Sequence, residues 1–129
     1  MGTNGQHKIM IVEDDEDLHV LYGLYLQGQD YEILRAYNGQ EAFKILETER
    51  PRLIILDMIM PVMDGEEFFV KLRTEKKITD IPVIIASVND KISSKILNLG
   101  NVHAILKKPF TIEVMIQHIE KALNGVKKA

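Results

Sequence analysis

The chain has 129 residues, with 46% hydrophobic and 27% charged side chains and a formal net charge of -3. These values are typical of one globular domain, and the net negative charge disfavours direct binding to nucleic acid. The absence of cysteine excludes disulfides, thiolate nucleophiles and thiolate metal sites. No apolar run is long enough to span a membrane, and the polar first residues lack the apolar core of a signal peptide. We therefore expect a cytoplasmic domain with no membrane partner.

Strand and helix patterns alternate five times along the chain. The expected strands are the short apolar runs at residues 8–12, 31–36, 53–56, 82–86 and 102–106. We expect residues 1–7 to form a flexible segment, residues 8–124 to form the domain, and residues 125–129 to form a short tail.

Each expected strand is followed by a helical pattern. The first helix follows the acidic residues 13–17, and its apolar stripe is expected at Leu18, Leu21, Tyr22 and Tyr25, with Gly28 to end it. The residues expected to cap the later helices are Asn38, Asp64 (with Glu67 completing a capping box), Asp90 or a neighbour, and Thr111. The last two helices are expected to end at Gly100 and Gly125.

The third expected strand is apolar without alternation and stops at a single carboxylate, Asp57. A run of this kind is typical of a strand buried on both faces, as in a parallel sheet covered by helices. Five successive strand–helix units indicate an α/β fold with helices on both faces of the sheet. The pattern leaves the strand order open.

Polar residues follow the ends of four expected strands. They are Glu13 and Asp14, Asp57, Ser87 and Lys108. Each has a simple structural interpretation, since acids cap helices, a serine can begin a turn and a lysine can face solvent. Because the carboxyl ends of parallel strands meet at one edge of the sheet, their joint occurrence predicts a site there.

Three carboxylates about 5 Å apart repel one another by roughly 3 kcal/mol per pair at an effective dielectric constant near 20. Mg²⁺, which prefers oxygen ligands, would offset that repulsion, and Lys108 would add a permanent positive charge. With a hydrogen bond from Ser87, this set could stabilise a phosphoryl group in transit to a carboxylate nucleophile, Asp57. The four histidines have no metal-ligand spacing and are expected at the surface or partly packed: His7, His19, His103 and His118.

Four segments together resemble the receiver domain of two-component response regulators, over about residues 8–123. They are the run 9–14, the block 56–65, the strand that ends at Ser87, and Lys108-Pro109-Phe110. The resemblance implies a flavodoxin-like fold with strand order 2-1-3-4-5. It also implies a phosphoryl group received from a sensor histidine kinase or a histidine phosphotransfer protein, and a dimer that forms on phosphorylation. Such a module is not an enzyme beyond catalysing its own phosphorylation and slow dephosphorylation.

The resemblance also implies roles for single residues. Asp57 would accept the phosphoryl group, and Mg²⁺ would be bound by Asp14, by Asp57, by Glu13 through a water, and by the backbone carbonyl of Ile59. Ser87 and Lys108 would contact the phosphoryl group, and the Lys108–Pro109 peptide bond would be cis.

The chain departs from the family pattern at the residues expected to report phosphorylation. Ile105 stands where an aromatic switch residue is usual, Val88 replaces a small residue after the hydroxyl position, and residues 100–108 form a segment one residue longer than usual. These departures concern Ser87 and Ile105, through which the fourth strand, fourth helix and fifth strand would respond.

Two other classes of protein stay open. One is a cofactor-binding domain such as a flavin binder, against which the acids at 13–17 argue because they would repel a phosphate. The other is a receiver-like interaction module that works without phosphorylation, against which the complete set of acids, hydroxyl and lysine argues.

Overall fold

The computed structural model describes residues 7–60, 62–88 and 91–127. Within them, five strands alternate with five helices, as the sequence pattern predicts. The strands are β1 (His7–Val12), β2 (Tyr31–Ala36), β3 (Leu53–Asp57), β4 (Val83–Ser87) and β5 (Val102–Lys107). The helices are α1 (Glu16–Leu26), α2 (Gly39–Leu46), α3 (Gly65–Thr74), α4 (Ser94–Leu99) and α5 (Ile112–Lys127).

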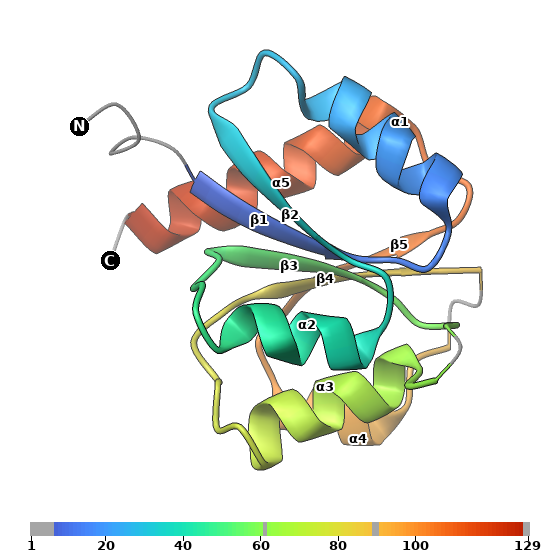
Figure 1. Cartoon of the computed structure of the whole chain (residues 1–129), viewed down its shortest axis with the longest axis vertical. Helices are drawn as coiled ribbons and strands as arrows, with labels where there is room; N and C mark the ends of the chain where they lie inside the picture. The colour runs from blue at the N-terminus through green and yellow to red at the C-terminus, as the bar shows by residue number, and fades with distance from the viewer. Residues whose placement is uncertain (1–6, 61, 89–90, 128–129) are drawn as a thin grey trace.

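The strands form one parallel sheet in the order β2-β1-β3-β4-β5, which confirms the expected flavodoxin-like topology. Helices α1 and α5 cover one face of the sheet, and α2, α3 and α4 cover the other (Figure 1). None of the helices in the described residues is long and apolar enough to cross a membrane.

The sheet lies between two hydrophobic cores. In β1, Met10 and Val12 pack into the core on the α2–α3–α4 side, whereas Ile9 and Ile11 pack into the core beneath α1 and α5. Successive side chains of a strand point to opposite faces, so a strand with two covered faces needs an unbroken apolar run. This explains why β3 is buried along its whole length, including Asp57 at its end.

Side-chain caps begin three of the helices, α2, α3 and α5, where the sequence predicted them. The Asn38 Oδ1 atom accepts from the backbone N–H of Glu41 at 2.9 Å, and Asp64 Oδ1 accepts from Glu67 at 2.9 Å. The Thr111 hydroxyl oxygen accepts from the N–H of Val114 at 3.2 Å. The predicted starts of α2, α3 and α5 are confirmed.

The predicted buried face of α1 is partly wrong. Its buried residues are His19, Tyr22 and Leu26, whereas Leu21 and Tyr25 are 38% and 40% exposed. Because α1 is apolar around most of its circumference, the periodicity could not decide which stripe faces the sheet. His19, which was expected at the surface or partly packed, is instead fully buried, with 1% exposure.

Element boundaries also differ from the expectations. β1 begins one residue earlier, at His7, and the rest of the expected flexible segment lies outside the described residues. α4 begins at Ser94 with Ser93 as its cap, after Asp90, which also lies outside them. α5 continues past Gly125 to Lys127, because glycine permits a helix to end without forcing it to.

The extra residue between Gly100 and Lys108 is absorbed at the start of β5. Val83 pairs with Val102 and Ile84 with Ala104, so the register passes over His103. A bulge of this kind adds one residue to a strand and leaves the later pairs intact. After the bulge the register is regular, and Ile105 pairs with Ile85.

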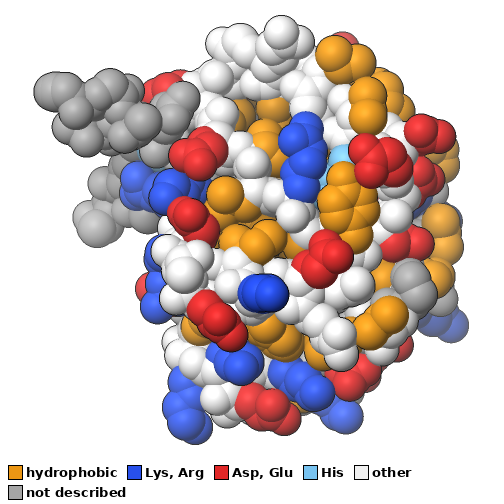
Figure 2. All heavy atoms as spheres, in the orientation of Figure 1, with side chains coloured by type: hydrophobic (Ala, Val, Ile, Leu, Met, Phe, Trp, Pro, Cys, Tyr) orange, Lys and Arg blue, Asp and Glu red, His pale blue; other side chains and the backbone are white. Residues whose placement is uncertain are grey.

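The face shown in Figure 2 carries acidic and basic side chains interspersed with apolar ones. It presents no broad patch of one sign, as expected for a small net charge.

Candidate functional site

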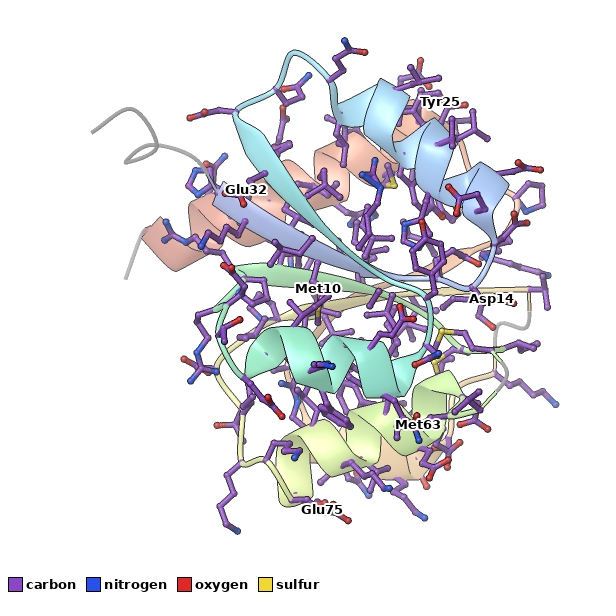
Figure 3. All side chains as sticks on the ribbon, in the orientation of Figure 1. Met10, Asp14, Tyr25, Glu32, Met63 and Glu75 are labelled. Atoms are coloured by element: carbon purple, nitrogen blue, oxygen red, sulfur yellow. The ribbon has the colours of Figure 1, made fainter. Side chains whose placement is uncertain are left out.

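The carboxyl ends of the strands bring the predicted polar residues to one edge of the sheet. Glu13 and Asp14 directly follow β1, Asp57 and Ser87 are the last residues of β3 and β4, and Lys108 directly follows β5. Figure 3 labels Asp14 at the end of β1, on the side where the other strands also finish. The topology therefore brings residues from four strand ends, which are far apart in the sequence, into one candidate site.

Three carboxylates form the centre of this site. One oxygen each of Glu13, Asp14 and Asp57 can be chosen so that all lie within 4.8 Å of one another. Glu13 and Asp57 are buried, with 3% and 7% exposure, while Asp14 is exposed to solvent. An all-oxygen donor set with one open side suits a hard divalent cation that keeps part of its water shell.

Lys108 bridges the two buried carboxylates. Its Nζ atom lies 3.3 Å from Glu13 Oε1 and 3.3 Å from Asp57 Oδ1. The backbone N–H of Lys108 donates to the Ser87 carbonyl oxygen at 2.7 Å, which fixes the start of the β5–α5 loop against the end of β4. The Lys108–Pro109 peptide bond is cis, as the resemblance implied.

The electrostatics of the site follow from burial of like charges. Burial and the neighbouring Asp57 raise the pKa of Glu13 from its ordinary 4.5 to about 7, although Lys108 opposes the shift. Burial alone would lower the pKa of Lys108, but the attraction of Glu13 and Asp57 outweighs it and raises that pKa. The lysine stays charged, but its single positive charge does not balance the negative charge of the carboxylate cluster.

Gly65 allows α3 to begin directly against the site. A Cβ atom at this position would lie 2.5 Å from the backbone oxygen of Asp57 and 2.6 Å from the Cα atom of Met58. The Gly65 N–H donates to the Met58 carbonyl oxygen at 3.0 Å. Only glycine permits this approach, so Gly65 helps to shape the loop that follows Asp57.

A family model for the response regulator receiver domain matches residues 9–120. The chain belongs to the receiver family. The acidic cluster of Glu13, Asp14 and Asp57 is typical of the phosphorylation site in this family. A receiver domain is a signalling module rather than an enzyme, and it implies a histidine kinase as partner.

Curated relatives of this receiver domain include bacterial regulators. The chain is 34% identical over 105 residues to the alkaline phosphatase synthesis transcriptional regulatory protein PhoP of Bacillus subtilis, covering 81% of this chain and 43% of PhoP. It is 32% identical over 120 residues to the transcriptional regulatory protein CrdR of Helicobacter pylori, covering 92% of this chain and 56% of CrdR. The chain thus spans about half the length of the curated relatives it matches.

Solved receiver structures share the whole fold. The signal receiver domain of a signal transduction histidine kinase from Syntrophus aciditrophicus is 30% identical, with a TM-score of 0.83 and coverage of 95% of this chain and 94% of that one. The response regulator TrrA of Thermotoga maritima, crystallised in complex with Mg²⁺–BeF, is 28% identical, with a TM-score of 0.77 and coverage of 90% and 98%.

The structure also describes the other predicted site residues, Ser87, Ile59 and Ile105. Ser87 is buried at the end of β4, and the side chain of Ile59 is 65% exposed just beyond Asp57. Ile105 is 38% exposed on β5, and its role as a switch residue stays a prediction. The sequence interpretation did not place His19 near the site, but its Nε2 atom lies 2.7 Å from the carbonyl oxygen of Glu13. The signal that could have found it is its place at i, i+3 and i+7 with Tyr22 and Leu26.

Proposed function

We propose that this receiver domain takes a phosphoryl group from a histidine kinase, or from a histidine phosphotransfer protein, onto Asp57 in the cytoplasm. The observation that carries the proposal is the position of Lys108 Nζ, 3.3 Å from Asp57 Oδ1 and 3.3 Å from Glu13 Oε1. A cation held beside a buried carboxylate can neutralise charge on an incoming phosphoryl group.

The donor set fits Mg²⁺. Glu13, Asp14 and Asp57 offer carboxylate oxygens within 4.8 Å of one another, and we propose the backbone carbonyl of Ile59 as a further ligand. The raised pKa of Glu13 is consistent with a site that lacks positive charge without a metal. When bound, Mg²⁺ would neutralise charge on the carboxylates and on the phosphoryl oxygens.

The transfer itself requires little covalent chemistry from the protein. A carboxylate oxygen of Asp57 attacks the phosphorus atom of phosphohistidine, and the P–O bond forms as the P–N bond breaks. The bonding electrons leave with the imidazole nitrogen, which takes up a proton from water. Lys108 stays paired with the developing charge, and the Ser87 hydroxyl donates a hydrogen bond to a phosphoryl oxygen.

The signal would leave the site through Ser87 and Ile105. Ser87 ends β4, and Ile105 lies on the neighbouring strand β5, paired with Ile85. A movement of the Ser87 hydroxyl toward the phosphoryl group would alter the packing beside Ile105. Because isoleucine has no ring and no hydroxyl, Ile105 can respond only through a change in its packing contacts. This distinguishes the chain from receivers with an aromatic residue at that position.

A small-molecule phosphodonor such as phosphoramidate, with and without Mg²⁺, tests the proposal by intact mass. Wild type should gain one phosphoryl group only with Mg²⁺, and Asp57→Asn should gain none. Asp64→Asn is the matched control, because asparagine caps a helix as well as aspartate does and Asp64 serves as the cap of α3. Equal labelling of wild type and Asp57→Asn would reject Asp57 as the acceptor.

A further inference from the structure

His19 belongs to no role described above, yet it touches the backbone of the acidic cluster. We propose that His19 is a positioning residue for Mg²⁺ binding, which acts by holding the peptide group between Glu13 and Asp14. This inference rests on the proposed function, because it assigns His19 to the same metal-dependent site.

The contact is short and buried. His19 Nε2 lies 2.7 Å from the carbonyl oxygen of Glu13 and 3.2 Å from that of Ala36, and the residue is 1% exposed. Both partners are carbonyl oxygens, which only accept hydrogen bonds, so Nε2 carries the hydrogen and donates it to both. The side chain therefore ties α1 to the ends of β1 and β2.

This bond completes the restraint on the backbone of Glu13. The Glu13 N–H donates to the Ala36 carbonyl oxygen at 3.0 Å, and the Glu13 carbonyl accepts from His19. The Glu13 carbonyl belongs to the peptide group that links Glu13 to Asp14, so the bond from His19 also fixes the start of Asp14. Since the side chain of Asp14 is exposed, its direction depends mainly on this backbone.

The other ring nitrogen indicates that histidine is not an ordinary core residue here. Among the residues that the structure describes, His19 Nδ1 has no hydrogen-bond partner although it is buried. A buried polar atom without a hydrogen-bond partner costs stability, so an aliphatic side chain would suit burial alone better. What histidine adds is the donor to Glu13, while its ring packs on Tyr37 with centroids 4.3 Å apart.

Restraint of the backbone matters because the carboxylates repel one another. Without a cation, repulsion favours conformations that move Asp14 away from Glu13 and Asp57. A backbone that already places Asp14 correctly reduces the cost of assembling the metal ligands. Loss of groups that orient metal ligands typically weakens metal affinity by about 10- to 100-fold.

The test is a Mg²⁺ titration of His19 variants, read by NMR chemical shifts and by the rate of phosphorylation from phosphoramidate. His19→Leu should raise the half-saturating Mg²⁺ concentration by about 10-fold. It should leave the rate at saturating Mg²⁺ within about twofold of wild type, because Asp57, Ser87 and Lys108 are untouched. His19→Gln, whose amide can donate to the same carbonyls, should restore most of the affinity.

Leu26→Ala is the matched control. Leu26 is also buried, with 3% exposure, but it is the last residue of α1, at the opposite end of the helix from the acidic cluster. It should lower the melting temperature without changing the half-saturating concentration. Should His19→Leu not fold, His19→Phe carries the same expectation, because it keeps the ring against Tyr37 and removes the donor.

Two negative results separate the two proposals. If His19→Leu, or His19→Phe in its place, melts earlier but binds Mg²⁺ like wild type, His19 only fills the core and the inference is wrong. If wild type itself shows neither Mg²⁺ binding nor phosphorylation, the proposed function fails before His19 is tested.

Discussion

The carboxylates of Glu13 and Asp57 lie within 4.8 Å of each other, and both side chains are buried. One ammonium group, that of Lys108, lies 3.3 Å from each of them. Two like charges in a desolvated space with a single opposite charge leave the metal-free site electrostatically unfavourable. The same excess of negative charge attracts a cation, so the site favours cation binding over metal-free stability.

The first prediction concerns the pH dependence of the metal-free protein. The pKa of Glu13 is raised from 4.5 to about 7 by burial and by Asp57, so between these values the folded state binds more protons than the unfolded state. The contribution of protonated Glu13 to the free energy of unfolding is fully present below pH 4.5. It is lost as pH rises through 7, by at most about 3 kcal/mol. Chemical denaturation in EDTA should show this decline, and Glu13→Gln should flatten it. A wild-type curve that does not differ from that of Glu13→Gln would contradict the raised pKa.

The second prediction concerns Asp14, the exposed member of the cluster. Asp14→Ala should weaken Mg²⁺ binding while stabilising the metal-free protein by about 1 kcal/mol, because it removes repulsion that solvent already screens in part. Calorimetric melting with EDTA and with Mg²⁺ measures both effects. The control, Asp17→Ala, removes an acid of the first turn of α1 instead. It should neither weaken Mg²⁺ binding nor stabilise the metal-free protein. A metal-free melting temperature that falls in Asp14→Ala would argue against the cluster.

The third prediction concerns the lifetime of the phosphorylated state. Hydrolysis needs a water molecule aligned with the aspartyl phosphate, and the exposed side chain of Ile59 cannot hydrogen-bond one. We expect Val88 to narrow the approach as well, and Asn89, which could orient a water, lies outside the described residues. Slow self-dephosphorylation is therefore expected. Ile59→Asn should shorten the lifetime several-fold, within the range that orienting groups provide, while Ile59→Leu should not. Equal lifetimes for wild type and Ile59→Asn would refute this view of the water's approach.

The fourth prediction concerns backbone strain at Val62, in the loop between β3 and α3. Its φ angle is +69°, which is unfavourable for a β-branched residue, and its side chain is 69% exposed and so contributes little packing. Val62→Asn should stabilise the protein by about 0.5–1 kcal/mol, because asparagine tolerates the left-handed region better. Val88→Asn, at an exposed valine outside the positive-φ positions of the described residues, should be neutral within about 0.5 kcal/mol. Urea unfolding of both variants is the measurement, and a loss of stability in Val62→Asn alone would contradict the strain.

The fold and the acidic site could be predicted because their signals are local. The unbroken apolar run of β3 reveals a strand covered on both faces, and polar residues directly after strands identify the functional edge of the sheet. The caps at Asn38, Asp64 and Thr111 depend on side-chain bonds to the next turn, which are also local.

The features that could not be predicted from the sequence depend on tertiary packing. The buried face of α1 could not be predicted from a helix that is apolar nearly all round, so His19 was expected at the surface or only partly packed. An extra residue between Gly100 and Lys108 was visible, but only pairing with β4 places the bulge at His103. The close approach of Gly65 to the Asp57 backbone likewise depends on how α3 packs against the strand end.

The most direct measurement of the central claim is the identity of the phosphorylated residue. Borohydride converts an aspartyl phosphate into homoserine, so wild-type protein treated with phosphoramidate and Mg²⁺, reduced and analysed by tandem mass spectrometry should contain homoserine at position 57 only. Homoserine at position 14 or 64 in place of 57, or no homoserine in protein that has gained a phosphoryl group, would contradict the assignment of Asp57 as the acceptor.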